Sequence, residues 1–405
     1  MASSYFFSTP IIAFFVLFLL PISSSSAPSP KNHSRFSNKE LFTHLQKLNK
    51  PSTKTIQSPD GDVIDCVPSH LQLAFDHPKL KGEKLLDLPE RPKGNGVSGE
   101  VEVEVEVQRW RSSGEECPEG TIAVRRTMEK DILRASSIRS FGRKPAVSVR
   151  RDSTGSGHEH AIGYANGEFY GAKASLGVWT PTVSTPTEFS LSQIWVISGS
   201  FNGDLNTIEA GWQVNPQLYG DSSPRFFTYW TTDSYQGTGC YNLLCSGFVQ
   251  TTNKIAIGAA ISPSSIYGRD QFDITLLVWK DPKHGHWWLE FGSGLLVGYW
   301  PSRLFTHLAD SANMVQFGGE IFNSHSSPFH TSTQMGSGHF SGEGFRHAAY
   351  FRNLQVVDSG NSLIPLYNIR VLADHQTCYD IRGGVNRAWG NYFYYGGPGR
   401  NVRCP

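Results

Sequence analysis

The chain has 405 residues, too many for one small domain, with a low charged fraction of 18% and high contents of glycine (40 residues) and aromatics (12%). This composition favours short strands joined by tight turns, so we expect an all-β core. The formal net charge of +1 lacks the strong bias typical of proteins that bind nucleic acids or membrane surfaces, and we expect neither partner.

The N-terminus is typical of a secretory signal peptide. Residues 11–20 form an apolar run that is too short to span a bilayer, and small residues follow at 23–27. We therefore expect residues 1–26 to be removed during export, which would leave no membrane anchor. The only N-glycosylation sequon begins at Asn32.

The six cysteines of an exported chain favour disulfides over thiol chemistry, and the absence of a CxxC motif argues against zinc. Sequence alone leaves the pairing open. The division of the chain into segments favours the pairs Cys240–Cys245, Cys378–Cys404 and Cys66–Cys117.

The first part of the chain predicts a small mixed α/β unit. A capping box at Ser37 and leucines at helical spacing predict a helix that ends before Pro51, and a second helix is expected at about 127–137. Alternating Glu and Val at 101–107 predict an edge strand, and residues 150–157 predict an exposed linker.

The rest of the chain predicts an antiparallel β-sandwich of jelly-roll type. Asn166-Gly167 indicates a hairpin, and a short helix is expected at 301–308. The other candidate strands are 189–198, 206–214, 225–232, 254–261, 272–279, 286–291, 295–299, 314–322 and 348–357.

Two of these strands carry mirrored motifs, Glu209-Ala-Gly-Trp-Gln213 and Gln316-Phe-Gly-Gly-Glu320. Alternate residues of a strand share a face, so each Glu lies on one face with a Gly and a Gln. If the strands pair antiparallel and in register, Glu meets Glu, Gly meets Gly and Gln meets Gln. Gly211 and Gly318 would then leave room for a substrate backbone, and the glutamines could donate hydrogen bonds.

Two carboxyls held together in a partly dry cleft cannot both ionise easily, so they share a proton over an acidic range. Such a pair can activate a water with one carboxylate while the other acid polarises a carbonyl or protonates a leaving group. The simpler interpretation is that each Glu faces solvent on a half-buried sheet.

Long motifs in both parts of the chain resemble the neprosin family. In the second part these are residues 192–196, 208–214, 238–245, 274–282, 287–288, 298–301, 318–320 and 394–399. Residues 60–68, 74–78 and 117–122 resemble the activation peptide of the family.

The resemblance implies a secreted plant glutamic peptidase of the apoplast or cell wall, made as a zymogen, that cuts after proline in an acidic setting. It implies an inhibitory propeptide at 27–151, a two-sheet sandwich at 152–405, and Glu209 and Glu320 as the catalytic pair. It also implies the Cys240–Cys245 and Cys378–Cys404 pairings, a monomer and no cofactor. Phe317 stands where we expect Trp in many relatives, which concerns the substrate cleft.

Charge suggests how the two parts hold together, because residues 1–151 carry +5 and residues 152–405 carry −4. We expect acid to weaken this attraction and release the propeptide, with cleavage between about 147 and 157. Tyr229 and Trp230 are candidates for a proline-binding or sugar-binding groove, although core packing is the simpler interpretation for either one. Gln213 and Gln316 are candidate substrate-binding residues through their amides.

Other readings of the sequence are weaker. We expect no metal at His158-Glu159-His160, which falls in the predicted linker, or at His284-Gly285-His286 in a predicted turn. A glycoside hydrolase also uses two carboxylates, and a non-catalytic glycan- or peptide-binding sandwich would need an aromatic groove without a proton-sharing pair.

Overall fold

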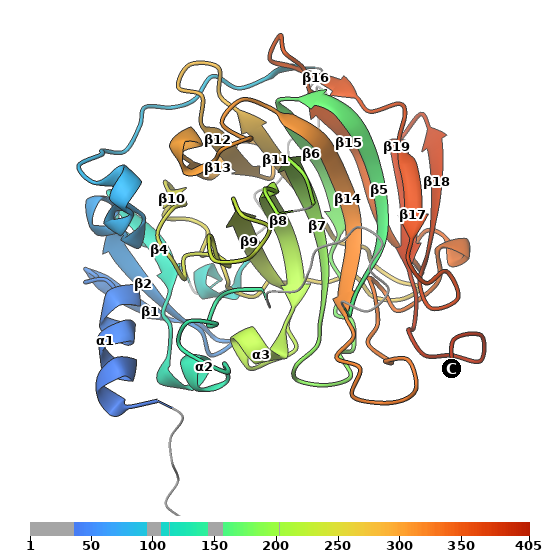
Figure 1. Cartoon of the computed structure of the whole chain (residues 1–405), viewed down its shortest axis with the longest axis horizontal. Coiled ribbons are helices and arrows are strands. Elements are labelled where there is room, and N and C mark those ends of the chain that lie inside the picture. Colours follow the sequence, from blue (N-terminus) through green and yellow to red (C-terminus); the bar gives the residue numbers. More distant parts are fainter. Residues whose placement is uncertain (1–35, 95–106, 113, 145–156, 202) are drawn as a thin grey trace, which may run out of the picture. The chain divides into compact units, whose positions relative to one another are not determined.

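The computed structural model describes residues 36–94, 107–112, 114–144, 157–201 and 203–405 (Figure 1). The N-terminal segment, residues 36–144, contains a three-stranded antiparallel sheet in the order β1-β2-β4. Its elements are α1 (Asn38–Leu48), β1 (Lys54–Gln57), β2 (Val63–Pro68), β3 (Lys93–Gly94), β4 (Thr121–Arg125) and α2 (Glu129–Leu133), with short 3-10 turns between them.

Residues 157–405 form a β-sandwich of two large sheets. One sheet of six strands has the order β17-β5-β14-β7-β8-β9, and all its neighbours are antiparallel. Its strands are β5 (His158–Phe169), β7 (Phe189–Ser198), β8 (Asn206–Val214), β9 (Arg225–Thr231), β14 (Ala312–Phe322) and β17 (Arg370–Ala373).

The second sheet has the order β10-β13-β12-β11-β6-β15-β16-β3, with β19 and β18 attached to β15. Its remaining strands are β6 (Gly171–Gly177), β10 (Val249–Gln250), β11 (Asp273–Lys280), β12 (Trp287–Phe291), β13 (Leu295–Trp300), β15 (Ala349–Val357), β16 (Ser362–Pro365), β18 (Asp380–Asn386) and β19 (Gly390–Gly396). A short helix, α3 (Pro216–Tyr219), follows β8.

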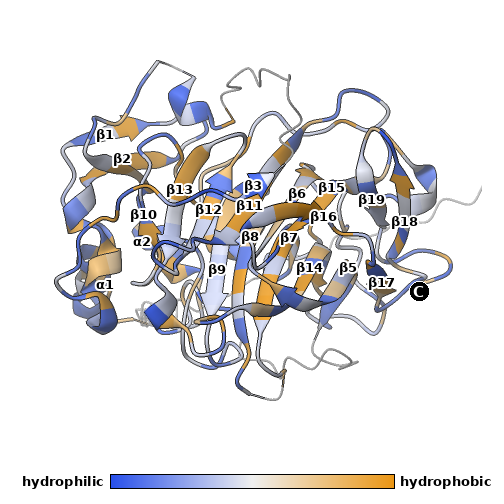
Figure 2. Ribbon diagram, turned by 90° about the horizontal axis from the view of Figure 1, so that it is seen from above, coloured by the Kyte–Doolittle hydropathy of each residue, from blue (hydrophilic) through white to orange (hydrophobic). Residues whose placement is uncertain are grey.

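The core lies between the two sheets, because alternate residues of each strand turn inward. Trp212 and Val315 of the six-stranded sheet belong to one buried cluster with Leu276, Trp288 and Phe351 of the other. In Figure 2 hydrophobic residues run along many of the strands, and hydrophilic residues are frequent in the connecting loops. The predicted antiparallel β-sandwich, preceded by a small α/β unit, is therefore confirmed.

The N-terminal segment contains both predicted helices, α1 and α2. The Ser37 hydroxyl accepts a hydrogen bond from the Glu40 amide at 3.2 Å, and the Glu40 carboxylate accepts one from the Ser37 amide at 3.2 Å. This completes the capping box of α1. The second helix, α2, is shorter than the predicted 127–137.

The predicted hairpin at Asn166-Gly167 is wrong. These residues lie inside β5, where the pairing with β14 shifts by one residue, which is a β-bulge. The chain then passes at Tyr170 into β6, which belongs to the other sheet. An Asn-Gly pair favours a turn-like backbone, and here the strand absorbs it as a bulge.

Two further elements differ from prediction. Residues 254–261 form isolated bridges through Ile257 and Ala260 instead of a strand. The predicted helix at 301–308 is a 3-10 turn at Ser302–Leu304. The signal peptide, the sequon at Asn32, the Glu/Val repeat at 101–106 and linker residues 150–156 lie outside the described residues.

Three disulfides join the six cysteines as predicted: Cys66–Cys117 in the N-terminal segment, and Cys240–Cys245 and Cys378–Cys404 in the sandwich. Such bonds are typical of proteins that fold in an oxidising compartment. No helix among the described residues is long and apolar enough to cross a bilayer.

Candidate active site

The two mirrored motifs lie on β8 and β14, but these strands are not neighbours. β7 lies between them and pairs antiparallel with both, so β8 and β14 run parallel to each other. Glu209 and Gln316 both stand opposite Trp195, and Gln213 and Glu320 both stand opposite Leu191. The predicted register, with Glu directly facing Glu, is therefore wrong, and the two glutamates lie diagonally across β7.

Between the two glutamates lies Gln193, at the centre of the mirrored pattern. Gly211 and Gly318 stand opposite it on either side. A Cβ atom at Gly211 would lie 2.7 Å from the Gln193 Cβ, and Gly318 has a φ of +147°, so a side chain is disfavoured at both positions. The glycines thus keep the sheet surface around Gln193 low, as an approaching peptide backbone requires.

Glu209 is fully buried in a ring of hydrogen-bond donors. Its Oε2 accepts from Gln193 Nε2 at 3.0 Å, and its Oε1 accepts from the Tyr235 hydroxyl at 2.6 Å and from Thr207 Oγ1 at 2.9 Å. Such donors stabilise a carboxylate away from water and fix its orientation.

Glu320 is also buried, with 3% of its surface exposed. Its Oε1 lies 2.5 Å from Nδ1 of His158, the first residue of β5. The His158 ring packs against Phe189 and Phe322, whose ring centroids lie 5.8 and 5.1 Å away. His158 therefore holds the second carboxyl group in place from a neighbouring strand.

A lysine of the N-terminal segment bridges the two carboxyls. Lys144 Nζ lies 2.7 Å from Oε2 of Glu209 and 3.6 Å from Oε2 of Glu320. The same Nζ lies 5.3 and 5.2 Å from the ring centres of Tyr229 and Tyr235, which forms an aromatic wall around the cation. One ammonium thus lies close to both buried carboxyls.

The electrostatics of this site favour the charged forms of Glu320 and Lys144. Burial raises the pKa of Glu320, but Lys144 and His158 outweigh it and hold that pKa well below its usual range. Burial lowers the pKa of Lys144, but the two glutamates outweigh it and raise that pKa above its usual value. Burial, followed by the charge of Glu209, raises the pKa of Tyr235, so its hydroxyl remains a donor.

The other predicted site residues have different positions. Tyr229 pairs with Glu209 across the sheet, and its hydroxyl accepts a hydrogen bond from the Lys144 amide at 3.3 Å. Trp230 faces the opposite way and packs in the core against Phe305. It therefore does not line the site.

The two predicted glutamines contact neither glutamate through any hydrogen bond found among the described residues. Gln213 donates to the Tyr219 hydroxyl at 2.9 Å, and Gln316 donates to the Met314 sulfur at 3.0 Å. The amide that does contact a glutamate is Gln193, between them. Gly211 and Gly318 stand opposite Gln193 on its two sides. The two glycines could have indicated Gln193 only if the order of the strands had been known.

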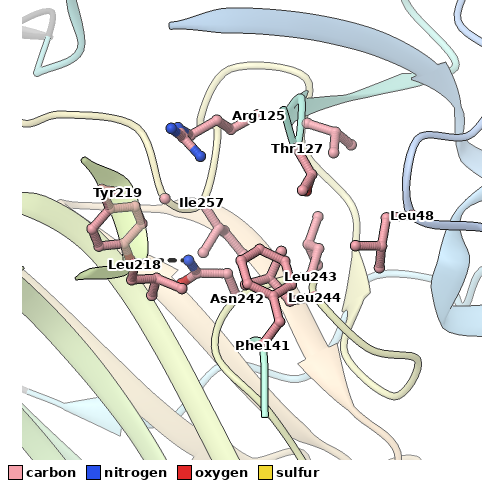
Figure 3. A pocket seen from close by; sticks show the side chains of 12 residues that line it. Leu48, Arg125, Thr127, Phe141, Leu218, Tyr219, Asn242, Leu243, Leu244 and Ile257 are labelled. Atoms are coloured by element: carbon pink, nitrogen blue, oxygen red, sulfur yellow. Dashed lines mark hydrogen bonds between the residues drawn. The ribbon is translucent and has the colours of Figure 1, made fainter. Parts of the chain in front are cut away.

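Apolar contacts seat the N-terminal segment beside the site. Figure 3 shows a pocket where Leu48 and Phe141 of that segment approach Leu218, Leu243 and other residues of the sandwich. Phe141 precedes Lys144 by three residues and is buried in the same cluster as Leu218. This packing fixes the chain that carries the lysine.

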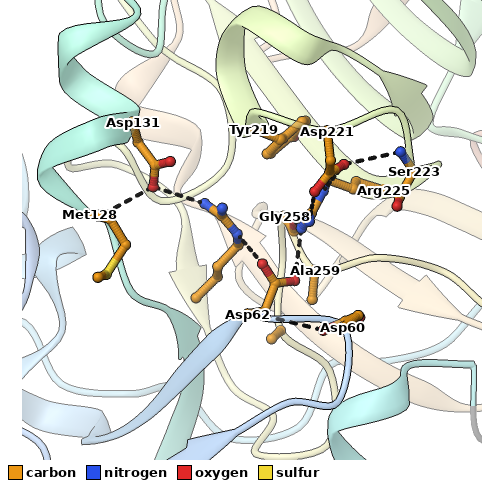
Figure 4. Close-up of polar contacts among 12 residues, drawn as sticks. Asp60, Asp62, Met128, Asp131, Tyr219, Asp221, Ser223, Arg225, Gly258 and Ala259 are labelled. Carbon is orange, nitrogen blue, oxygen red and sulfur yellow. Dashed lines mark hydrogen bonds and ion pairs between the residues drawn. The ribbon is translucent and has the colours of Figure 1, made fainter.

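A buried ion network adds polar contacts at the same interface (Figure 4). Asp62 of the N-terminal segment accepts from Arg125 Nε at 2.8 Å and from Arg225 Nη1 of β9 at 2.7 Å. Arg225, 1% exposed, also pairs with Asp221 at 2.5 Å. The Asp62–Arg225 pair therefore joins an acidic group of the N-terminal segment to a basic group of the sandwich, the reverse of the Lys144–Glu209 pair. The net charges of the two parts predict only pairs of the Lys144–Glu209 kind.

Lys144, His158 and Tyr235 at this site were also missed by sequence reasoning. The first two lie on either side of the region 147–157 in which cleavage is expected. Their only signal was their type: a lysine and a histidine flanking the expected cleavage region. Tyr235 lies in a loop and has a positive φ of 64°, a conformation that local sequence did not indicate.

Comparisons with known proteins identify two family matches in this chain. A family model described as neprosin matches residues 186–398, and one described as neprosin activation peptide matches residues 55–164. Glu209 and Glu320 lie in the first match, and Lys144 lies in the second.

Among solved structures, two complexes of scytalido-glutamic peptidase with transition-state analogues are similar at 14% and 12% identity, each with a TM-score of 0.32. They cover 60% and 58% of this chain and 98% and 97% of their own. A β-porphyranase of the human gut bacterium Bacteroides plebeius is similar at 8% identity with a TM-score of 0.19, over 38% of this chain and 52% of its own. Because the neprosin model spans more than half of the sequence, the chain belongs to the neprosin family.

Proposed function

We propose that this neprosin-family peptidase is a glutamic endopeptidase in which Glu209 and Glu320 form the catalytic pair. The observation that carries the proposal is that one ammonium, Lys144 Nζ, lies within 2.7 and 3.6 Å of both buried carboxylates. Two carboxylates from different strands that share one cation can share one proton once that cation leaves.

The chemistry follows from that exchange. Without Lys144, one carboxyl group is ionised and the other is protonated. The ionised carboxylate takes a proton from a water as that water attacks the scissile carbonyl carbon. The other, protonated carboxyl donates a hydrogen bond to the carbonyl oxygen, and a proton then passes to the leaving nitrogen as the C–N bond breaks. In this proposal the Gln193 amide, which donates to Glu209 at 3.0 Å in the precursor, turns to stabilise the developing oxyanion.

The N-terminal segment acts in this proposal as an intramolecular inhibitor. The apolar contacts of Leu48 and Phe141 and the Asp62–Arg225 pair hold Lys144 close to Glu209 and Glu320. Cleavage between about 147 and 157 would release residues 27–151 from the mature enzyme. Three disulfides and the predicted signal peptide support secretion to the apoplast or cell wall. Preference for proline-containing substrates rests on family membership.

A direct test uses the secreted full chain, exposed to a pH series from 3 to 7, with two quenched peptides that differ only by proline or alanine at the cleaved position. We expect cleavage after proline at acid pH once the N-terminal segment has been removed. A folded, processed chain that binds the peptides but cleaves neither would instead favour the binding-module reading.

Asp62→Asn will weaken the hold of the N-terminal segment. The substitution keeps the shape of the side chain but removes the charge that pairs with buried Arg225, and breaking a buried pair costs about 3–5 kcal/mol. We expect conversion to the mature form at least roughly tenfold faster at a fixed acid pH. Gel analysis over time measures this, with exposed Asp87→Asn as the control; equal rates in both variants would refute the role of Asp62.

His158→Gln will test whether this histidine is a positioning residue for Glu320. Losing a hydrogen bond to a charged group of about 1.5–3 kcal/mol will lower kcat/KM of the processed enzyme roughly 10- to 100-fold. Because His158 lowers the Glu320 pKa, the acid limb of the pH profile will also move to higher pH. A purely structural role would reduce activity without that movement, which the exposed control His307→Gln will also lack.

A further inference from the structure

We propose that Glu159, His330 and His375 form a binding site for one divalent metal ion, with Zn²⁺ the best matched. The three side chains come from separate segments: the start of β5, the loop between β14 and β15, and the turn after β17. Their ligand atoms all lie within 4.8 Å of one another. Two imidazole nitrogens and one carboxylate are a donor set that zinc favours.

The three groups already converge on one point. Nε2 of His330 lies 2.9 Å from Oε2 of Glu159 and 3.0 Å from Oε1, and Nδ1 of His375 lies 2.7 Å from Oε2. Glu159 stands opposite Ile321 in β14 and therefore faces the core side of the sheet, away from His158 and Glu320. The site is thus separate from the proposed dyad.

Surrounding groups orient these ligands. Nδ1 of His330 donates to the Thr331 carbonyl oxygen at 2.8 Å, which fixes the ring so that Nε2 is directed at Glu159. Asn323 Nδ2 supports the carboxylate by donating to Oε1 at 3.3 Å.

Burial and access fit a bound ion. Glu159 has 4% of its surface exposed, so its charge needs a partner, whereas the His375 side chain is 44% exposed and provides a route from solvent. The backbone amide of Cys378 donates to the His375 carbonyl at 2.9 Å, and the Cys378–Cys404 disulfide anchors that turn. A metal here would join β5, the 323–334 loop and the C-terminal tail.

Local sequence could not indicate this site. The sequence places Glu159 beside His158 and His160 in a predicted linker, and this pattern predicts no metal site. Alternation along β5 separates Glu159 from both histidines, and its actual partner His330 is 171 residues away.

The test is a zinc titration of the full-length precursor, made without a histidine tag, treated with EDTA and dialysed at pH 7.5. Calorimetry should give one Zn²⁺ per chain with a micromolar or tighter Kd, and thermal denaturation should show a higher Tm with Zn²⁺ than with EDTA. His375→Ala, at a half-exposed position that tolerates truncation, should weaken binding at least about tenfold.

The matched control is His307→Ala, because His307 is similarly exposed and pairs with one carboxylate, Asp204, at 2.8 Å. It should bind Zn²⁺ as the wild type does. The proposal is overturned if the wild type shows no saturable binding, or if His375→Ala binds as tightly as the wild type. His330→Gln provides a second check, and circular dichroism confirms that each variant is folded.

Discussion

Replacing Glu320 with glutamine will lower kcat/KM of the processed enzyme by at least roughly 10³-fold, and Glu209→Gln will do the same. Glutamine keeps the size of the side chain but can neither take a proton from water nor donate an acidic one. Initial rates on a quenched proline-containing peptide at acid pH measure the loss.

The double variant should be little worse than either single one, because the two carboxyls act as a unit and their losses do not add. Glu343→Gln is the matched control, because Glu343 is exposed. Its carboxylate contacts the side chains of His339 and Tyr267. This variant should retain full activity. Either dyad variant keeping a tenth of wild-type activity would contradict the assignment.

Lys144→Met will make the uncleaved precursor active. Methionine has a similar length but no charge, so the two buried carboxylates lose the cation that lies 2.7 and 3.6 Å away. Breaking such a buried pair costs about 3–5 kcal/mol, which corresponds to roughly 100-fold or more in the closed-to-open ratio of the N-terminal segment. We expect cleavage of a short peptide by the uncleaved precursor to rise by at least roughly tenfold.

The measurement is the initial rate at mildly acid pH, with gels confirming that the chain is still intact. Lys130→Met, an exposed lysine of the same segment, is the control and should leave the precursor inactive. Unchanged inactivity of Lys144→Met would show that the bulk of the segment, and not this cation, blocks the site.

The sign of the Glu320 shift sets a limit on how acid can activate the precursor. Because the folded pKa of Glu320 lies well below its usual value, its stabilising contact with Lys144 is complete above the ordinary glutamate pKa and is lost only as pH falls through the depressed value. Mild acid therefore leaves this bridge intact. Contacts elsewhere, or cleavage of residues 145–157, must withdraw the lysine first.

Strand alternation in the sequence predicted β7 and β8 with the bounds that the structure has, and it placed each glutamate on a face with its glycine. It did not predict which strands are neighbours, because mirrored motifs fit an antiparallel pair as well as two parallel strands flanking a third. Gln193 became recognisable only once β7 was known to lie between them.

The contacts that sequence reasoning could not supply are long-range ones. Lys144 is 65 residues from Glu209, and His158 is 162 residues from Glu320. No regular sequence spacing predicts either contact, because each depends on how the N-terminal segment or β5 packs in the folded protein. The same holds for Glu159 and His330.

The central claim is that Glu209 and Glu320 hydrolyse peptide bonds once the N-terminal segment is removed. The most direct measurement is product analysis by mass spectrometry of a proline-containing peptide, incubated at acid pH with processed wild type and with processed Glu209→Gln. To obtain both in the same form, the chains are processed by the active wild type, which is then removed by its affinity tag. We predict cleavage after proline by the wild type alone; cleavage by both, or by neither folded protein, would contradict the claim.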